Sequence, residues 1–159
     1  GLGFIPVLAG RNVVAARAGH PLTRRKAIAQ ADLAPYPWIA PPANSPLYRD
    51  LERALKSIGQ EDFNVSFSGG TLASIQSVMA GSDALTVLPY SVVFLSRRSV
   101  PLEALPLRID HPERQLGLLM PENRPGPPAM RQLIAFLTEE FARLTARMEH
   151  DQQVTRRRG

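Results

Sequence analysis

Cysteine is absent from the 159-residue chain. Its absence excludes a disulfide framework, a cysteine-ligated zinc site, an iron–sulfur cluster and a thiol nucleophile. Lysine is scarce as well, because only Lys26 and Lys56 are lysines and every other basic residue except histidine is an arginine. The net charge of +5 is spread along the chain, and no basic stripe carries interleaved aromatic residues. The charge is therefore a weak indication of nucleic-acid binding, and general solubility accounts for it.

Long apolar runs are also missing. The longest, such as residues 13–16 and 92–95, are at most about five residues long, whereas a membrane-spanning helix needs roughly 18. The N-terminus shows no basic leader followed by an apolar segment, so no signal peptide is predicted. We therefore expect a cytoplasmic protein with no membrane partner. Because the sequence begins Gly-Leu-Gly without a methionine, we also expect a processed or truncated piece.

The composition and the order of patterns fit an α/β protein. Apolar residues make up 44% and charged residues 21%, as in ordinary globular domains. Strands are predicted at residues 12–17, 37–40, 64–68, 84–88, 105–109 and 115–120, and helices at residues 46–58, 72–80, 91–96 and 130–148. This alternation predicts βαβ units around a mainly parallel sheet, whose ligands bind beyond the carboxyl ends of the strands.

The helix from Met130 to Met148 is the most regular of these elements. Its large apolar side chains recur at helical spacing and form one stripe, which consists of Met130, Leu133, Ile134, Leu137, Phe141, Leu144 and Met148. The polar residues 149–159 that follow are expected to fray. Since an exposed stripe of this size is costly, we predict that two copies of the chain bury it against each other as a homodimer.

No catalytic, cofactor or metal motif is recognisable. The segment Gly1-Leu2-Gly3 lacks the third glycine and the preceding strand of a dinucleotide-binding loop. The three histidines, His20, His111 and His150, lie far apart in the sequence and in no paired ligand motif, so each is interpreted as a surface or loop histidine. The pair Asp110-His111 has no nucleophile elbow to accompany it. We therefore predict a protein that is not an enzyme and that needs no cofactor and no metal.

Two predicted strand-to-helix junctions carry hydroxyl groups: the PPANS loop, residues 41–45, and the SGGT loop, residues 68–71. Helix N-termini expose unpaired N–H groups and partial positive charge, and glycines let a ligand approach the backbone, so a carboxylate could bind there. Plain N-capping explains the same hydroxyls, and the sequence leaves both interpretations open. The candidate binding residues are Pro42, Asn44, Ser45, Ser68, Gly69, Gly70 and Thr71.

An ordered set of segments resembles a known family. These segments are AARAGHPLTRRKAIAQADLAPYPWIAPP, SGGTLASIQSVMAGSDALTVLPYSVV, LEALPLRI and PGPPAMRQLIAFLTEE. Together they are similar to the effector-binding (substrate-binding) domain of LysR-type transcriptional regulators, and the resemblance covers roughly residues 5–143. No single motif is diagnostic, but the order of the set is fairly specific.

The resemblance implies a fold and a division of the chain. The fold is a periplasmic-binding-protein-like (type II) three-layer α/β sandwich of two subdomains, with a small molecule in the cleft. Residues 1–18 and 114–148 would belong to a partial first subdomain, residues 19–113 would form a complete second subdomain, and residues 149–159 would be a basic tail. The PPANS loop, Gly70 and Thr71 match family positions that face the effector.

The resemblance also implies a function. A small organic anion would bind to the domain and alter transcription, and DNA would be contacted only through an N-terminal helix-turn-helix that this sequence lacks. The alternative is a solute-binding protein or an enzyme of the same fold. Direct nucleic-acid binding through Arg156, Arg157 and Arg158 is a third and weaker hypothesis.

Overall fold

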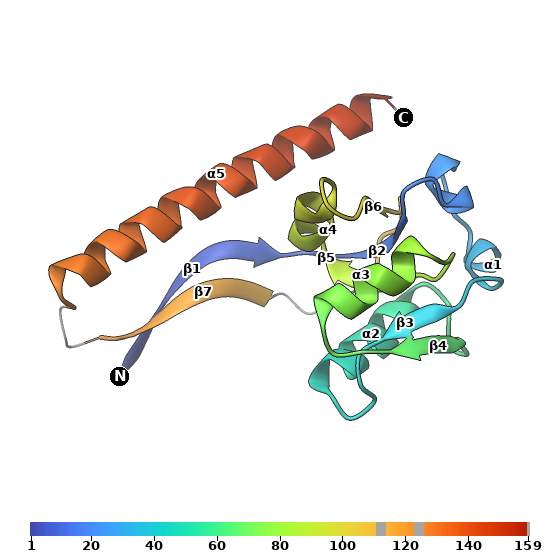
Figure 1. Cartoon of the computed structure of the whole chain (residues 1–159), viewed down its shortest axis with the longest axis horizontal. Coiled ribbons are helices and arrows are strands. Elements are labelled where there is room, and N and C mark those ends of the chain that lie inside the picture. Colours follow the sequence, from blue (N-terminus) through green and yellow to red (C-terminus); the bar gives the residue numbers. More distant parts are fainter. Residues whose placement is uncertain (111–113, 123–125, 159) are drawn as a thin grey trace. The chain divides into compact units, whose positions relative to one another are not determined.

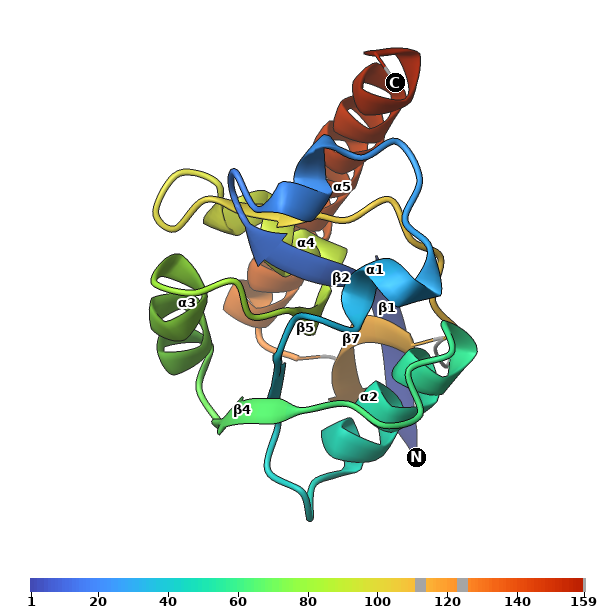
Figure 2. The ribbon, with the colours of Figure 1, turned by 90° about the vertical axis from the view of Figure 1, so that its right-hand side faces the viewer.

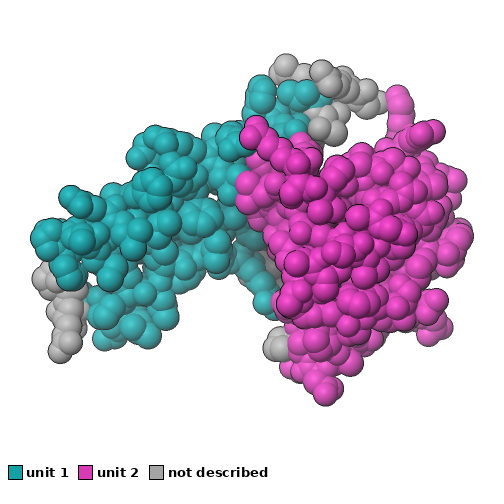
Figure 3. All heavy atoms as spheres, in the orientation of Figure 1, with its two compact units in different colours: residues 1–10, 113–159 teal, residues 11–112 magenta. Residues whose placement is uncertain are grey.

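The computed structural model of the chain describes residues 1–110, 114–122 and 126–158. The chain divides into two compact units, one made of residues 1–10 and 113–159 and the other of residues 11–112 (Figure 3). The first of these, unit 1, is therefore built from the two ends of the chain. The second, unit 2, is built from one continuous segment.

Unit 2 contains most of the regular elements (Figure 1). In chain order they are β2 (Asn12–Arg17), the 3-10 helix η1 (Pro21–Arg24), α1 (Gln30–Leu33), β3 (Trp38–Ala40), α2 (Pro46–Ser57), β4 (Val65–Ser68), α3 (Leu72–Ala80), β5 (Thr86–Pro89), α4 (Tyr90–Ser96) and β6 (Leu102–Ala104). The α/β class predicted from the sequence is confirmed. The predicted ends of β2, β3, α2, β4 and α3 differ from the observed ends by no more than one residue.

The strands of unit 2 lie side by side in the order β4-β3-β5-β2-β6. Strands β3 and β4 pair in parallel, and the N–H of Ile39 donates to the carbonyl of Leu85, 2.8 Å away, which joins β3 to the start of β5. Strand β2 pairs antiparallel with β5 on one side and with β6 on the other. Four strands thus run in one direction, as predicted, but both ladders of β2 are antiparallel, which the sequence interpretation missed.

Helices cover both faces of these strands. Leu51 and Leu55 of α2 are buried in one cluster with Trp38 and Val14, on one face. Helices α3 and α4 lie together on the other face, where the Gln76 side chain of α3 donates to the Ser96 hydroxyl of α4 at 2.7 Å. Figure 2 shows α2 and α3 on different sides of the strands. Right-handed crossovers explain this placement, because the chain moves outward from β3 to β4 and then back to β5.

Unit 1 is an antiparallel pair of strands with one long helix. Strand β1 (Leu2–Gly10) pairs with β7 (Arg114–Pro121), and α5 (Pro128–Arg158) packs against β1. The sequence patterns did not predict β1, which contains Pro6. The register shifts between Pro6 and Leu8, and such an irregularity is where a strand accommodates a proline.

Two further predictions need correction. The strand expected at residues 105–109 is displaced, since β6 occupies residues 102–104 and Pro106, which has no N–H to donate, follows one residue after Leu105. Every second residue of this segment still faces the interior, because Leu105, Leu107 and Ile109 pack on the core. Helix α5 continues to Arg158 instead of fraying after Met148, since no glycine or proline interrupts the polar residues that extend it.

The histidines differ from one another in their surroundings. His20 was interpreted as a surface or loop residue, but its side chain is fully buried. Its Nδ1 accepts from the N–H of Leu22 at 3.1 Å, and its Nε2 lies 3.2 Å from the carbonyl oxygen of Asp83. His20 therefore ties the start of η1 to the turn before β5. His150 is exposed on α5, and His111 lies outside the described residues.

Candidate functional site

The PPANS and SGGT loops lie next to each other in unit 2. Each leaves the carboxyl end of a strand, β3 or β4, and those two strands pair in parallel with Ala40 opposite Ser68. The Ser68 hydroxyl donates to the carbonyl of Pro41 at 3.3 Å, and the N–H of Gly69 donates to the carbonyl of Ala40 at 3.1 Å. Two loops that are well separated in the sequence are thereby joined at one edge of the sheet.

The PPANS loop is a tight turn that leads into α2. The N–H of Ser45 donates to the carbonyl of Pro42 at 2.9 Å, and the Ser45 hydroxyl accepts from the N–H of Tyr48 at 3.2 Å. Ser45 is thus the N-cap of α2, as the capping interpretation predicts. The side chains of Pro42 and Asn44 are exposed, while Ser45 is half-buried.

The SGGT loop is built in the same way at the start of α3. The Thr71 hydroxyl accepts from the N–H of Ser74 at 3.2 Å and donates to the Ser74 hydroxyl at 2.9 Å. The Ser74 hydroxyl in turn donates to the carbonyl of Thr71 at 2.8 Å. Thr71 is therefore a cap whose hydroxyl already has partners, although it is exposed. A ligand would have to share or replace these bonds.

The two glycines of the SGGT loop differ. A side chain on Gly69 would collide with the ring of Phe67 and come within 3.1 Å of the Ser74 hydroxyl, so this position needs glycine for space. A side chain on Gly70 would meet no atom within 4 Å. Gly70 is therefore open toward solvent, and an incoming ligand could approach the backbone there.

A positively charged side chain that was not predicted, Arg11, lies at the same edge of the sheet as the two loops. Strand β2 is antiparallel to β5, with Asn12 opposite Pro89, so the start of β2 lies beside the carboxyl end of β5. The Arg11 guanidinium lies 4.7 Å from the centre of the Tyr90 ring, and the N–H of Tyr90 donates to the carbonyl of Arg11 at 2.7 Å. Only β5 lies between β2 and β3 in the strand order, so Arg11 lies at the same end of the strands as the PPANS loop. The antiparallel direction of β2 places Arg11 there, and no pattern in the sequence predicts that direction.

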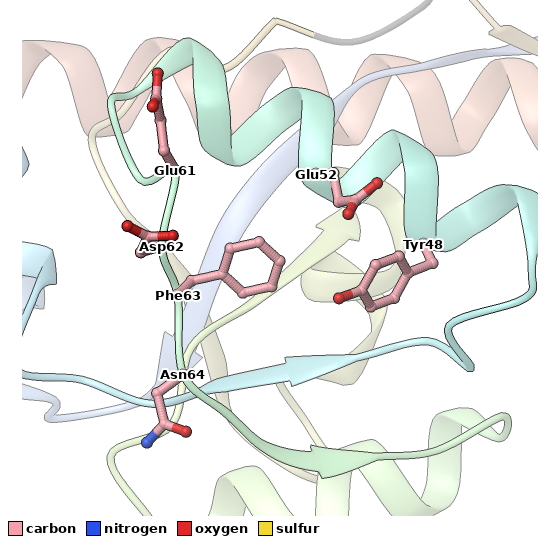
Figure 4. Close-up of a pocket in the computed structure, with 6 residues that line it drawn as sticks. All are labelled: Tyr48, Glu52, Glu61, Asp62, Phe63 and Asn64. Atoms are coloured by element: carbon pink, nitrogen blue, oxygen red, sulfur yellow. The ribbon is translucent and has the colours of Figure 1, made fainter.

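A separate pocket lies beside α2 and has different chemistry. Its volume is about 420 Å³, and it is lined by Tyr48, Glu52, Glu61, Asp62, Phe63 and Asn64 (Figure 4). The rings of Tyr48 and Phe63 lie 6.4 Å apart between their centres. None of the predicted site residues lines this pocket, and three of its side chains are carboxylates, which would repel an organic anion.

The described residues meet the requirements neither of a metal site nor of a membrane-spanning helix. Within residues 1–110, 114–122 and 126–158, no group of three or more histidine, aspartate or glutamate side chains is placed to hold a metal ion. Over the same residues, no helix is both long and apolar enough to cross a bilayer.

The family model described as LysR substrate binding domain matches residues 1–142. Solved structures with the same arrangement include a transcriptional regulator from Vibrio parahaemolyticus, at 19% identity and a TM-score of 0.67, where the match covers 91% of this chain and 67% of that one. This likeness confirms the predicted periplasmic-binding-protein-like α/β fold. No match is found among the curated proteins.

Two further solved structures hold small molecules. The CcmR regulatory domain of Synechocystis PCC6803, in complex with 2-PG, is 19% identical with a TM-score of 0.67, and the match covers 88% of this chain and 67% of that one. The effector-binding domain of QuiR, in complex with shikimate, is 18% identical with a TM-score of 0.58, and the match covers 89% and 63%. The chain thus spans about two thirds of the length of these structures.

Proposed function

The chain belongs to the LysR substrate-binding domain family, whose members are the effector-sensing domains of transcriptional regulators, and we propose that it binds a small organic acid at the PPANS and SGGT loops. The binding residues in this proposal are Pro42, Asn44, Ser45, Ser68, Gly69, Gly70 and Thr71. The same proposal assigns residues 1–18 and 114–148 to a partial first subdomain, and residues 19–113 to the second subdomain. The boundary at residue 113 lies outside the described residues.

The observation that carries the proposal is the direct contact between the two loops. The hydrogen bond from Ser68 to Pro41 holds the starts of α2 and α3 at one edge of the sheet. The amino ends of both helices therefore present N–H groups and partial positive charge to a common region. Gly70 leaves this region open to an approaching carboxylate.

Arg11 adds a full positive charge at the same edge of unit 2. Arginine is suited to carboxylates because its guanidinium donates two parallel hydrogen bonds to them. The Tyr90 ring supports the Arg11 side chain from one side. We expect Arg11 to steer an organic acid toward the loops, and the acidic pocket beside α2 to exclude it.

The regulator that contains this domain would respond by a change in the population of its conformations when the effector binds. We expect its DNA contacts to come from another part of the regulator, its subunits to form a homodimer, and its location to be the cytoplasm. The alternative from the sequence, a solute-binding protein or an enzyme of the same fold, gains no support from the comparisons, since the solved structures described above are regulators or their effector-binding domains.

Calorimetric titration with shikimate and with 2-PG tests the proposal, because both are acids held by proteins of similar fold. We expect one or both to bind, and we expect Thr71→Ala to weaken binding about fivefold or more, the equivalent of roughly 1 kcal/mol for one lost hydrogen bond. The matched control is Ser66→Ala, which removes an exposed hydroxyl from β4 outside the loops. Equal affinities for wild type and Thr71→Ala would show that Thr71 acts only as a cap.

A further inference from the structure

Two exposed leucines, Leu47 and Leu72, lie at the starts of the helices that follow the PPANS and SGGT loops. Leu47 is the second residue of α2 and is exposed to 58%, and Leu72 is the first residue of α3 and is exposed to 43%. Among the described residues of unit 2, the one other large apolar side chain so exposed is Leu95, on α4. Two of these three side chains therefore lie directly beside the proposed binding loops.

Leu47 belongs to the side of α2 that faces the core. Leu51 and Leu55, four and eight residues further along, are both buried in the cluster of unit 2. Residues at this spacing share one face of a helix. Leu47 thus continues the core-facing stripe of α2 past the point where the core ends, which leaves an apolar side chain uncovered next to the PPANS loop.

Leu72 has the same position on α3. Ile75 and Met79, three and seven residues further along, are partly and fully buried, so Leu72 begins the core-facing stripe of α3. Side chains on a helix lean toward its N-terminus, and both leucines therefore lean toward the loops. Because α2 and α3 lie on opposite sides of the strands (Figure 2), Leu47 and Leu72 flank the ends of β3 and β4 from both faces.

The sequence around both loops is uncharged. Residues 33–48 and residues 63–82 contain no aspartate, glutamate, lysine, arginine or histidine. An amino group on an effector would find no carboxylate in these segments to pair with. A hydroxyl group held against the two leucines would lose its hydrogen bonds to water without a replacement, which costs free energy. The helix starts, by contrast, offer N–H donors to a carboxylate.

On the basis of the proposed function, we propose that the effector is a carboxylic acid with an uncharged hydrocarbon body, and that Leu47 and Leu72 select it. The carboxylate binds at the helix starts, and the body lies between the two leucines, where its apolar surface leaves water. An acid of the same shape with hydroxyl groups on its body gains less from this contact. Leu47 and Leu72 are thus specificity-determining residues for the proposed site.

A matched pair of acids tests the preference. Cyclohex-1-ene-1-carboxylate has the ring and the carboxylate of shikimate but none of its three hydroxyl groups, and acetate supplies the carboxylate alone. Titrations followed by the amide NMR signals of Gly69 and Gly70 measure affinities into the millimolar range and report binding at the loop itself. We expect cyclohexenecarboxylate to bind about fivefold or more tightly than either shikimate or acetate.

Variants of the leucines test the assignment. Leu47→Asn and Leu72→Asn should each weaken cyclohexenecarboxylate binding about fivefold or more and change acetate binding less than about twofold. The matched control is Leu95→Asn, since Leu95 is exposed to 57% on a helix that follows neither loop. Dispersed amide spectra confirm that each variant is folded. An equal loss in Leu95→Asn, or no loss in both other variants, overturns the proposal.

The outcome also separates this proposal from the proposed function. If shikimate and acetate bind and Thr71→Ala weakens them, but cyclohexenecarboxylate binds no more tightly, the hydrocarbon preference is overturned and the binding of acids at the loops stands. If none of the three acids shifts the Gly69 and Gly70 signals, both proposals are overturned.

Discussion

The Ser68 hydroxyl donates to the carbonyl oxygen of Pro41 at 3.3 Å, across a gap of 27 residues in the sequence. This bond joins the last residue of β4 to the first residue after β3. Together with the bond from the Gly69 N–H to the Ala40 carbonyl, it joins two separate capping loops into one surface of unit 2. The site proposal depends on it, because neither loop alone differs from an ordinary helix start.

The cap at Thr71 should be measurable without any ligand. Replacing Thr71 with alanine removes the acceptor for the Ser74 N–H and should lower the free energy of unfolding by about 1 kcal/mol. Thr71→Ser keeps the hydroxyl and should stay close to wild type. Urea unfolding followed by Trp38 fluorescence gives the comparison. Equal stability of the alanine variant and wild type would contradict the capping geometry.

Gly69 and Gly70 should respond oppositely to alanine. At Gly69 the new methyl group would lie 2.9 Å from the Cζ atom of the Phe67 ring, so we expect a loss of about 1–3 kcal/mol in unfolding free energy. Gly70→Ala meets nothing and should leave stability unchanged or slightly raised. Thermal denaturation of the two variants decides the matter, and each serves as the control for the other. A larger loss of stability in Gly70→Ala than in Gly69→Ala would contradict the conclusion that only Gly69 lacks room for a side chain.

Arg11 should matter for the binding of organic acids. Arg11→Gln removes the positive charge at the edge of the sheet and should weaken shikimate or 2-PG binding at least fivefold, with the greatest loss at low ionic strength. Arg53, exposed on α2, is a suitable control for net charge when changed to glutamine. Titrations at two salt concentrations separate a local contact from a general effect of charge. Equal weakening by both variants would leave Arg11 without a specific role.

His20 should be essential to the fold of unit 2. Replacing it with alanine leaves the Leu22 N–H without its acceptor and opens a cavity beside Tyr36, whose ring centre lies 4.5 Å away. We expect a loss of about 1–3 kcal/mol in unfolding free energy from the unpaired buried group alone. The exposed His150 on α5, changed to alanine, is the control. Chemical denaturation should show a large effect for His20 and almost none for His150.

The chain by itself should show no sequence-specific binding to DNA. The effector-domain match covers residues 1–142 and α5 runs to Arg158 as one helix, so the described residues place no helix-turn-helix. Weak retention through the arginines at residues 156–158 is expected only at low salt. Gel-shift experiments at two salt concentrations check this. A sub-micromolar shift that depends on sequence at physiological salt would contradict the assignment.

Local patterns in the sequence determined much of unit 2. The start of α2 follows from Ser45 before a proline, and α3 follows from Thr71 and a short apolar repeat, because capping and periodicity act over a few residues. The two hydroxyl loops could therefore be found as candidate sites. The same local reasoning failed at β1, where a proline inside the strand is tolerated only because the ladder with β7 is irregular at that point.

Only the tertiary structure decided how these pieces combine. The direction of β2 depends on which strands it pairs with, and antiparallel pairing with β5 is what brings Arg11 to the edge where the loops lie. The contact between Ser68 and Pro41 exists because β3 and β4 pair in a particular register, which no local sequence pattern specifies. Likewise, β1 and β7 are far apart in the sequence, and nothing local in either strand specifies that they pair. Strand partners are chosen by burial summed over the whole unit, so a window of neighbouring residues holds too little of that energy to reveal them.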